Sequence, residues 1–150
     1  MTYPDTNVDE IIDSCSVPVQ VDNSDQKNAA VVARFHHIWT PDLRILDAEE
    51  NELYRWDGYL PPSEFAARAL AGFGHARLRR REFDKAEKHF VEVLRAFPNS
   101  YAAAEANYYL GVVRYRANPE GNDLLHQWSI LRSKYPASEY RLKQSFKELP

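Results

Sequence analysis

The most versatile reactive group in this chain of 150 residues is the thiol of its single cysteine, Cys15. One thiol cannot form an internal disulfide, a CxxC redox pair or a cysteine-rich zinc site. A reactive thiol is also favoured by a helix N-terminus or by nearby cations. Cys15 instead follows Asp13 near the expected C-terminal end of a helix, so we predict a packed structural cysteine.

The histidines do not form a recognisable metal-binding or catalytic motif. His36 and His37 are adjacent in sequence, and adjacent side chains on a helix point in different directions. His75, His89 and His126 are scattered, without HxxxH or histidine–carboxylate spacing. A glycine-rich phosphate loop and a GxSxG motif are also missing from the sequence. We therefore predict no metal, no cofactor and no catalytic residue, with histidines that are solvated or partly packed.

One basic cluster runs from His75 to Arg81 and continues at Lys85 and Lys88. Such cations suit the C-terminal end of a helix, where they interact favourably with the free carbonyl groups. The net charge of the whole chain is −3, which gives no general attraction to phosphate backbones. The sequence therefore predicts neither a nucleic-acid partner nor a membrane partner, and it contains no apolar run of the ~20 residues that a membrane span needs.

The first part of the chain alternates short helical and extended patterns. Pro61-Pro62-Ser63-Glu64 is typical of the start of the next helix. Proline at position 18 suits an edge strand because it has no N–H group to donate. The expected elements are a short helix capped by Asp5 or Thr6, a strand over Val17–Val21, a helix over Gln26–His36 with Ala29, Ala30, Val32, Ala33 and Phe35 on its buried side, and two strands, Leu43–Leu46 and Leu53–Trp56, around a turn at Asp47–Asn51.

This order of elements resembles the C-terminal half of a thioredoxin fold, over roughly residues 1–80. The resemblance places Trp39-Thr40-Pro41 at the loop where that family has a cis-proline, and it implies a cis Thr40-Pro41 bond and a candidate peptide-binding loop at Trp39, Thr40 and Pro41. In the similar family members, a segment like Thr2-Tyr3-Pro4-Asp5 follows the CxxC pair. Here the chain begins at Met1, without the cysteines or the central strand.

The resemblance also implies an incomplete sheet. The missing central strand would lie between Val17–Val21 and Leu43–Leu46, so these two strands either pair directly or leave open edges that invite a strand from a partner. A three-stranded remnant with one covering helix is marginal by itself. The helices that follow are expected to stabilise it.

From Phe65 onward the apolar residues recur at helical spacing. Gly74, Ala86, Phe90 and Pro98 match the spacing of a tetratricopeptide repeat. Helix ends repeat at Phe97-Pro98 and Tyr135-Pro136, so the prolines are 38 residues apart (136 minus 98). Residues 137–149 are expected to form a last, capping helix with Leu142, Phe146 and Leu149. This part resembles a short tetratricopeptide-like array, whose concave face would bind a partner.

We therefore expect an α/β plus α protein with an incomplete thioredoxin-like domain in residues 1–64 and tetratricopeptide-like helices in residues 65–150. The predicted function is a non-catalytic protein-interaction module that binds a protein or peptide, with a homodimer through the exposed sheet edge as a further possibility. The alternative is the C-terminal portion of a thiol-disulfide oxidoreductase whose CxxC lies upstream of Met1. The N-terminus lacks a basic start and an apolar core, which is not typical of a signal peptide, so a soluble, cytoplasmic protein is expected.

Overall fold

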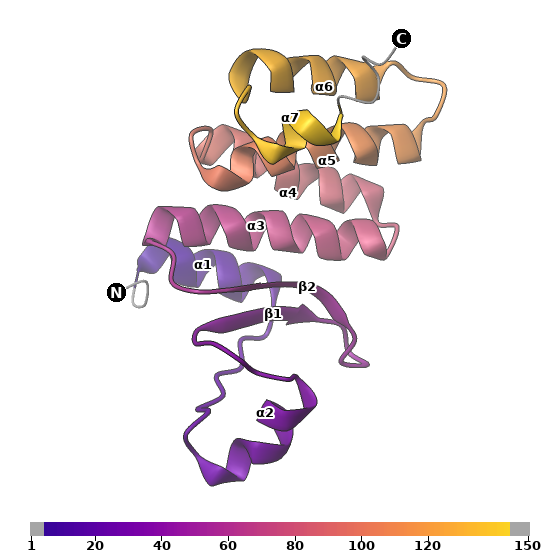
Figure 1. Cartoon of the computed structure of the whole chain (residues 1–150). Coiled ribbons are helices and arrows are strands. Elements are labelled where there is room, and N and C mark those ends of the chain that lie inside the picture. Colours follow the sequence, from indigo (N-terminus) through magenta and orange to yellow (C-terminus); the bar gives the residue numbers. More distant parts are fainter. Residues whose placement is uncertain (1–4, 145–150) are drawn as a thin grey trace.

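The computed structural model describes residues 5–144 as a mixed α/β structure (Figure 1). A two-stranded hairpin packs beside a row of helices, and a small helical segment lies on the other side of the hairpin. This confirms the expected class at the coarse level of α/β elements followed by helices. The elements in chain order are α1 (Thr6–Cys15), η1 (Gln26–Asn28), α2 (Ala29–Arg34), β1 (Asp42–Leu46), β2 (Glu52–Asp57), α3 (Pro62–Arg79), α4 (Phe83–Ala96), α5 (Tyr101–Ala117), α6 (Asp123–Lys134) and α7 (Glu139–Lys143).

Helix α1 begins where the sequence predicted. The Asp5 side chain accepts hydrogen bonds from the backbone N–H groups of Asn7 and Val8, both at 3.2 Å, which satisfies donors that the first helical turn leaves free. Val8 is only 1% exposed and packs on α3. The N-cap therefore fixes the start of α1, and its apolar side holds it on the helical row.

The strand predicted over Val17–Val21 is wrong. These residues are neither helical nor in the sheet, and Val17 and Val19 are 88% and 81% exposed. Isolated extended chain has no neighbour to satisfy its backbone groups, so the alternating apolar pattern is not sufficient to make a strand. The sheet within residues 5–144 accordingly has two strands in place of the three expected.

The helix predicted over Gln26–His36 is shorter and less buried than expected. A 3₁₀ turn, η1, leads into six residues of α2, and His36 adopts a positive φ of 48° beyond its end. Of the five residues expected on a buried side, Ala29, Ala30 and Ala33 are exposed, and Val32 and Phe35 are half-buried. The physical reason is that, among the helices and strands of residues 5–144, α2 packs closely only on η1, so few neighbouring side chains cover its apolar residues.

The hairpin follows the prediction closely. Leu43 pairs with Trp56 and Ile45 with Tyr54, so these four side chains share one face. That face packs on α3, where Ile45 and Tyr54 come so close to Gly72 that a Cβ there would lie 2.8 Å and 2.7 Å from their side chains. The hairpin is therefore seated on α3 through its apolar face.

Helix α3 lies at the centre of the molecule and belongs to both halves of the chain. Its residues 65–67 and 69–76 are all buried, because α1, the hairpin, α4 and α5 surround it. One apolar cluster joins α3 to α1 and the hairpin, and a second joins it to α4 and α5. Ile11 of α1 and Phe97 at the end of α4 pack against both clusters, so the core is continuous across residue 64.

Helices α3 to α6 pack in sequence order, each against the next. At the first contact, Phe90 fills the space beside Gly74, where a Cβ would lie 2.8 Å from its ring, and Ala86 is fully buried. At the third, Gly111 lies against Trp128, with a Cβ distance of 3.3 Å. Small residues at these contacts allow the helices to approach closely.

The last helix is only partly as predicted. Helix α7 covers five residues, and Leu142, expected to cap the repeats, is 71% exposed. Tyr140 packs there instead, with its ring 5.7 Å from that of Tyr108 and 6.2 Å from that of Tyr109. The expected positions of Phe146 and Leu149 lie outside residues 5–144. Within that range, no helix is both long and apolar enough to cross a membrane.

The close seat of the hairpin on α3 gives a first testable prediction. Gly72→Val should lower the free energy of unfolding by about 1–3 kcal/mol, because the new side chain collides with Tyr54 and Ile45. Native-state hydrogen exchange should then show the fastest amides in β1 and β2. Gly111→Ala is the matched control, because it crowds α6 and should leave the hairpin amides protected. Equal loss of protection throughout the chain in both variants would contradict the packing of the hairpin on α3 at Gly72.

Candidate functional site

The three residues singled out by the sequence, Trp39, Thr40 and Pro41, form the loop between α2 and β1. The Thr40-Pro41 peptide bond is cis, as the resemblance implied. Trp39 is 67% exposed and its neighbour Ile38 is 84% exposed. Two large apolar side chains therefore project into solvent directly before the sheet.

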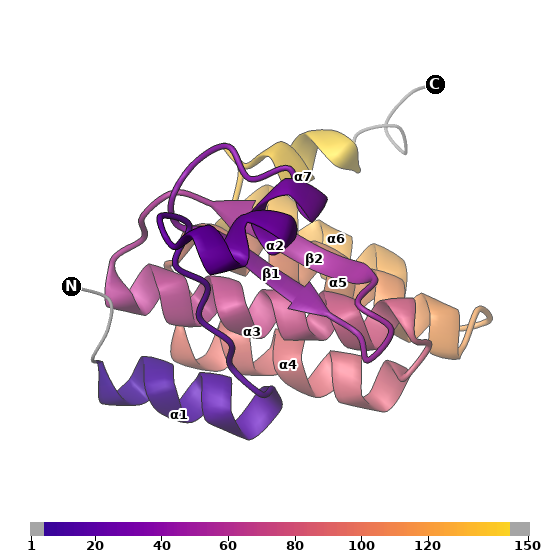
Figure 2. The same cartoon turned by 90° about the horizontal axis from the view of Figure 1, so that it is seen from below.

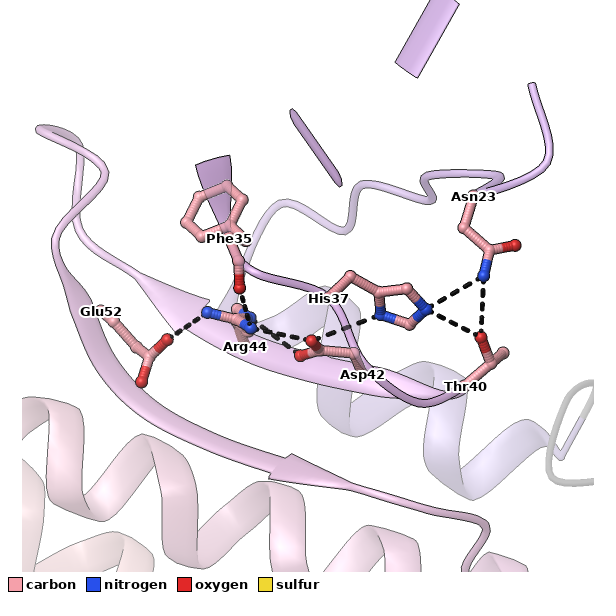
Figure 3. A network of polar contacts seen from close by, with 7 residues as sticks. All are labelled: Asn23, Phe35, His37, Thr40, Asp42, Arg44 and Glu52. Carbon is pink, nitrogen blue, oxygen red and sulfur yellow. Dashed lines mark hydrogen bonds and ion pairs between the residues drawn. The ribbon is translucent and has the colours of Figure 1, made fainter. Parts of the chain in front are cut away.

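A polar network holds this loop against the segment before η1 (Figure 3). The Asn23 side-chain amide donates to Thr40 Oγ1 at 3.0 Å and lies 3.0 Å from His37 Nε2. Thr40 Oγ1 is also 3.2 Å from His37 Nε2. Because the Asn23 Nδ2 atom only donates hydrogen bonds, His37 Nε2 acts as the acceptor and the ring carries its proton on Nδ1.

The other side of the His37 ring faces β1. Its Nδ1 atom lies 3.5 Å from Asp42 Oδ2. Asp42 is bound more tightly by Arg44, whose Nε and Nη2 atoms donate to the two carboxylate oxygens at 2.8 Å each. This hydrogen-bonded guanidinium holds the pKa of Asp42 below its ordinary value of 3.8.

Arg44 joins three segments of the chain. Besides Asp42, it donates to the backbone oxygen of Phe35 at 2.6 Å and to Glu52 on β2 at 2.6 Å. Its guanidinium also lies over the Phe35 ring at 5.1 Å. This single residue therefore fixes the end of α2 to the outer face of the hairpin.

The hydroxyl of Thr40, the imidazole of His37 and the carboxylate of Asp42 are arranged in the order of a nucleophilic triad. Two observations argue for a structural role instead. The carboxylate is already occupied by Arg44, and the Thr40 hydroxyl already accepts from Asn23. An open hollow of about 240 Å³ adjoins the network and is lined by Asn23, His37, Ile38, Trp39 and Thr40.

The strand after this loop has one open edge. The Gly58 N–H donates to the Pro41 oxygen at 2.9 Å. Because Leu43 lies opposite Trp56 and Ile45 opposite Tyr54, Leu43 and Ile45 also bond to β2. Antiparallel strands alternate their bonding direction, so the backbone groups of Asp42 and Arg44 point away from β2. The register shifts between Ile45 and Leu46, but the Asp47 N–H donates to the Asn51 oxygen at 3.1 Å, so the backbone groups of Leu46 point away from β2 as well. These groups have no backbone partner elsewhere in residues 5–144.

A second, buried polar cluster joins β2, α3 and α5, and the sequence did not reveal it. The Glu105 carboxylate accepts hydrogen bonds from Arg68 at 2.7 Å, from Tyr54 at 3.0 Å and from His75 at 2.8 Å. His75, expected to be solvated or partly packed, is 7% exposed and stacks on Tyr54 with ring centres 4.9 Å apart. The only sequence signal was an acidic residue inside the small apolar run Ala102–Ala106.

The pKa values in this cluster follow from its burial and its charges. Burial alone would raise the pKa of Glu105, but the hydrogen bond from His75, the charge of Arg68 and the Tyr54 hydroxyl outweigh it and hold the value below its ordinary 4.5. Burial, followed by the charge of Glu105, raises the pKa of Tyr54 to about 12. Glu105 is therefore ionised, and the cluster ties the hairpin to the helices.

Of the other residues considered in the sequence, Cys15 is packed against apolar side chains and cations of the basic cluster are held in ion pairs. Cys15 is half-buried and packs on the cluster shared by α1, α3 and the hairpin, as expected. In the basic cluster, Glu82 pairs with Arg77 at 3.0 Å, with Arg80 at 3.1 Å and with Lys85 at 2.9 Å. Within residues 5–144, no group of three or more His, Cys, Asp or Glu side chains is arranged to hold a metal ion.

Comparison of the chain with protein-family models, with curated protein sequences and with solved structures finds no match.

Proposed function

We propose that this chain is a non-catalytic protein-interaction module that binds an extended polypeptide segment along the free edge of β1. The observation that carries the proposal is the open row of backbone groups at Asp42, Arg44 and Leu46, directly beside the exposed loop Trp39-Thr40-Pro41. An unpaired strand edge is a template for a further strand. The bound segment would receive main-chain hydrogen bonds from β1 and apolar contact from Trp39.

The surroundings of the edge support binding of a polypeptide in particular. Of the residues between α1 and β1, Val17, Val19, Val21, Val31, Ile38 and Trp39 are large apolar residues in contact with solvent. Scattered exposed apolar residues are ordinary, but a concentration in one segment is typical of an interaction surface. The polar network around His37 and Arg44 holds the loop in place beside the edge, which lowers the entropic cost of binding.

The resemblances named above are part of the same proposal. The contact of Gly74 with Phe90, the full burial of Ala86 and the sequential packing of α3 to α6 support tetratricopeptide-like helices. The hairpin after a cis Thr40-Pro41 bond supports an incomplete thioredoxin-like half. On this reading the helices act mainly as the support of the hairpin, because Tyr54 already covers part of the face formed by α3 and α5.

Dithiol chemistry is not part of this proposal. Exchange between a dithiol and a disulfide needs two thiols, and this chain has only Cys15. No contact in residues 5–144 favours an oxidoreductase over an interaction module.

A proline substitution tests the proposed edge directly. Leu46→Pro removes one outward N–H without touching a hairpin hydrogen bond, and should weaken binding of an alternating valine peptide roughly fivefold, since one hydrogen bond contributes about 0.5–1.5 kcal/mol. Leu46→Ala keeps the N–H and is the matched control. The measurement is a titration followed by amide NMR spectra, with peptide-induced shifts expected at Asp42, Arg44 and Leu46.

The same spectra show whether the hairpin of each variant is folded. Peptide-induced shifts confined to α4–α6, or equal affinity of Leu46→Pro and Leu46→Ala for the peptide, would refute the proposed binding edge.

A further inference from the structure

Helix α1 and strand β1 border the same apolar cluster on α3. In the view of Figure 2, β1 lies between β2 and α1. Ile12 and Cys15 of α1 pack on the same apolar cluster as Leu43 of β1. No Cα atom of α1 comes within 8 Å of a Cα atom of β1, although both elements pack on α3. The two elements are therefore neighbours across the cluster without touching through their backbones.

The edge of this shared cluster is not fully covered. Val8 is buried, but Ile12, Cys15 and Leu43 are only half-buried. Covering half-buried apolar side chains at the border of a core with further apolar surface is favourable, because it removes that surface from water. These half-buried residues belong to α1 and β1, and the free backbone groups of Arg44 point away from β2, the direction in which α1 lies in the view of Figure 2.

A strand added to β1 would lie on this side. Neighbouring strands are about 4.8 Å apart, and side chains at matching positions point to the same face of the sheet. Residues of the added strand beside Leu43 and Ile45 would therefore point inward, toward α1 and α3. The intervening residues would point outward beside Asp42 and Arg44, which already satisfy each other.

We infer that the segment bound at β1 is a strand of another polypeptide that alternates apolar and polar residues, with its apolar side chains packed on Ile12 and Cys15 of α1. The inference rests on the proposed function and adds the chemical class of the partner and a second contact surface. The outward positions accept polar residues of either charge, because Arg44 is already paired with both Asp42 and Glu52. The side chains of the bound strand that point inward, beside Leu43 and Ile45, therefore determine which partner binds.

Cys15 provides the reporter for this contact, because it is the only cysteine in the chain. The probe is a synthetic peptide in which valine alternates with lysine and glutamate, and the comparison peptide has serine in place of each valine. With the full chain, saturating valine peptide should slow alkylation of Cys15 by iodoacetamide about tenfold, since thiol reactivity follows access. The serine peptide should bind about tenfold more weakly or worse.

A pair of variants on α1 separates contact from general effects. Ile12→Ala should weaken binding of the valine peptide about tenfold and leave binding of the serine peptide nearly unchanged. Asp13→Ala, on the exposed side of α1, should change neither affinity. Amide spectra of each variant without peptide establish that α1 and the hairpin are folded.

The outcomes distinguish this inference from the proposed function. Absence of peptide-induced shifts at Arg44 and Leu46 would overturn both. Shifts at these residues with unchanged Cys15 alkylation, or with equal affinity for the valine and serine peptides, would overturn only the packing on α1. A chain that is dimeric by light scattering and that loses peptide binding on dimerisation would show that the occupant is a second copy, which would overturn the assignment to another polypeptide.

Discussion

Glu105→Gln should lower the free energy of unfolding by about 3 kcal/mol, measured by urea denaturation near neutral pH. The substitution removes a buried negative charge that faces Arg68 and His75 and leaves the Arg68 guanidinium without its carboxylate. The Arg68 side chain is 27% exposed and can recover part of its hydration, so we expect the lower part of the usual range for a broken buried pair.

Glu87→Gln is the matched control for this prediction. Glu87 also pairs with an arginine of a neighbouring helix, Arg114 at 2.8 Å, but both side chains are considerably more exposed than Glu105. A partly exposed pair contributes less than about 1 kcal/mol. If both variants lost the same stability, burial of the Glu105 carboxylate would not be the cause.

The lowered pKa of Glu105 also predicts how stability depends on pH. The folded-state pKa lies below the ordinary 4.5, so the unfolded chain takes up this proton first as the pH falls. The contribution of Glu105 is therefore fully present above 4.5 and is lost as the pH falls through the folded value. The stability difference between the wild type and Glu105→Gln should shrink in that acid range and stay constant near neutral pH.

Phe90→Ala should cost about 3–5 kcal/mol, the usual loss for removing a large buried aromatic side chain. The Phe90 side chain is fully buried at the contact of α3 and α4, and its ring also lies edge-on to His75 at 5.4 Å. The cavity would open beside Gly74, which has no side chain to fill it. Thermal and urea denaturation measure the loss.

The neighbouring residue supplies the control for Phe90→Ala. Val91 follows Phe90 on α4 and is 40% exposed, so Val91→Ala should cost less than about 1 kcal/mol. If Phe90→Ala lowered the free energy of unfolding by less than Val91→Ala, α3 and α4 would not pack through the Phe90 ring. That result would count against the tetratricopeptide-like contact.

Local patterns predicted the elements whose stabilising contacts lie near them in sequence. The hairpin strands are separated by a five-residue turn, and Asp47 accepts hydrogen bonds from the Glu49 and Asn51 N–H groups at 3.0 Å and 2.8 Å. The helix pairs are likewise consecutive in the chain, so their apolar periodicity indicated the helices, while Gly74 and Phe90 were singled out by the resemblance to a tetratricopeptide repeat. A proline before a strand is a local signal for the break at Thr40-Pro41, and the resemblance to a thioredoxin fold singled out Trp39-Thr40-Pro41 as the candidate loop.

The sequence alone therefore determined the hairpin, the helical row and the position of the loop, because these depend on spacing within short segments. Only the tertiary structure decided which elements acquire neighbours. Val17–Val21 has the alternating pattern of a strand, but no neighbouring strand within residues 5–144 pairs with it. Helix α2 has apolar residues, but among the helices and strands of that range it packs only on η1. Glu105 of α5 meets Arg68 and His75 of α3, a contact that depends on how distant segments pack.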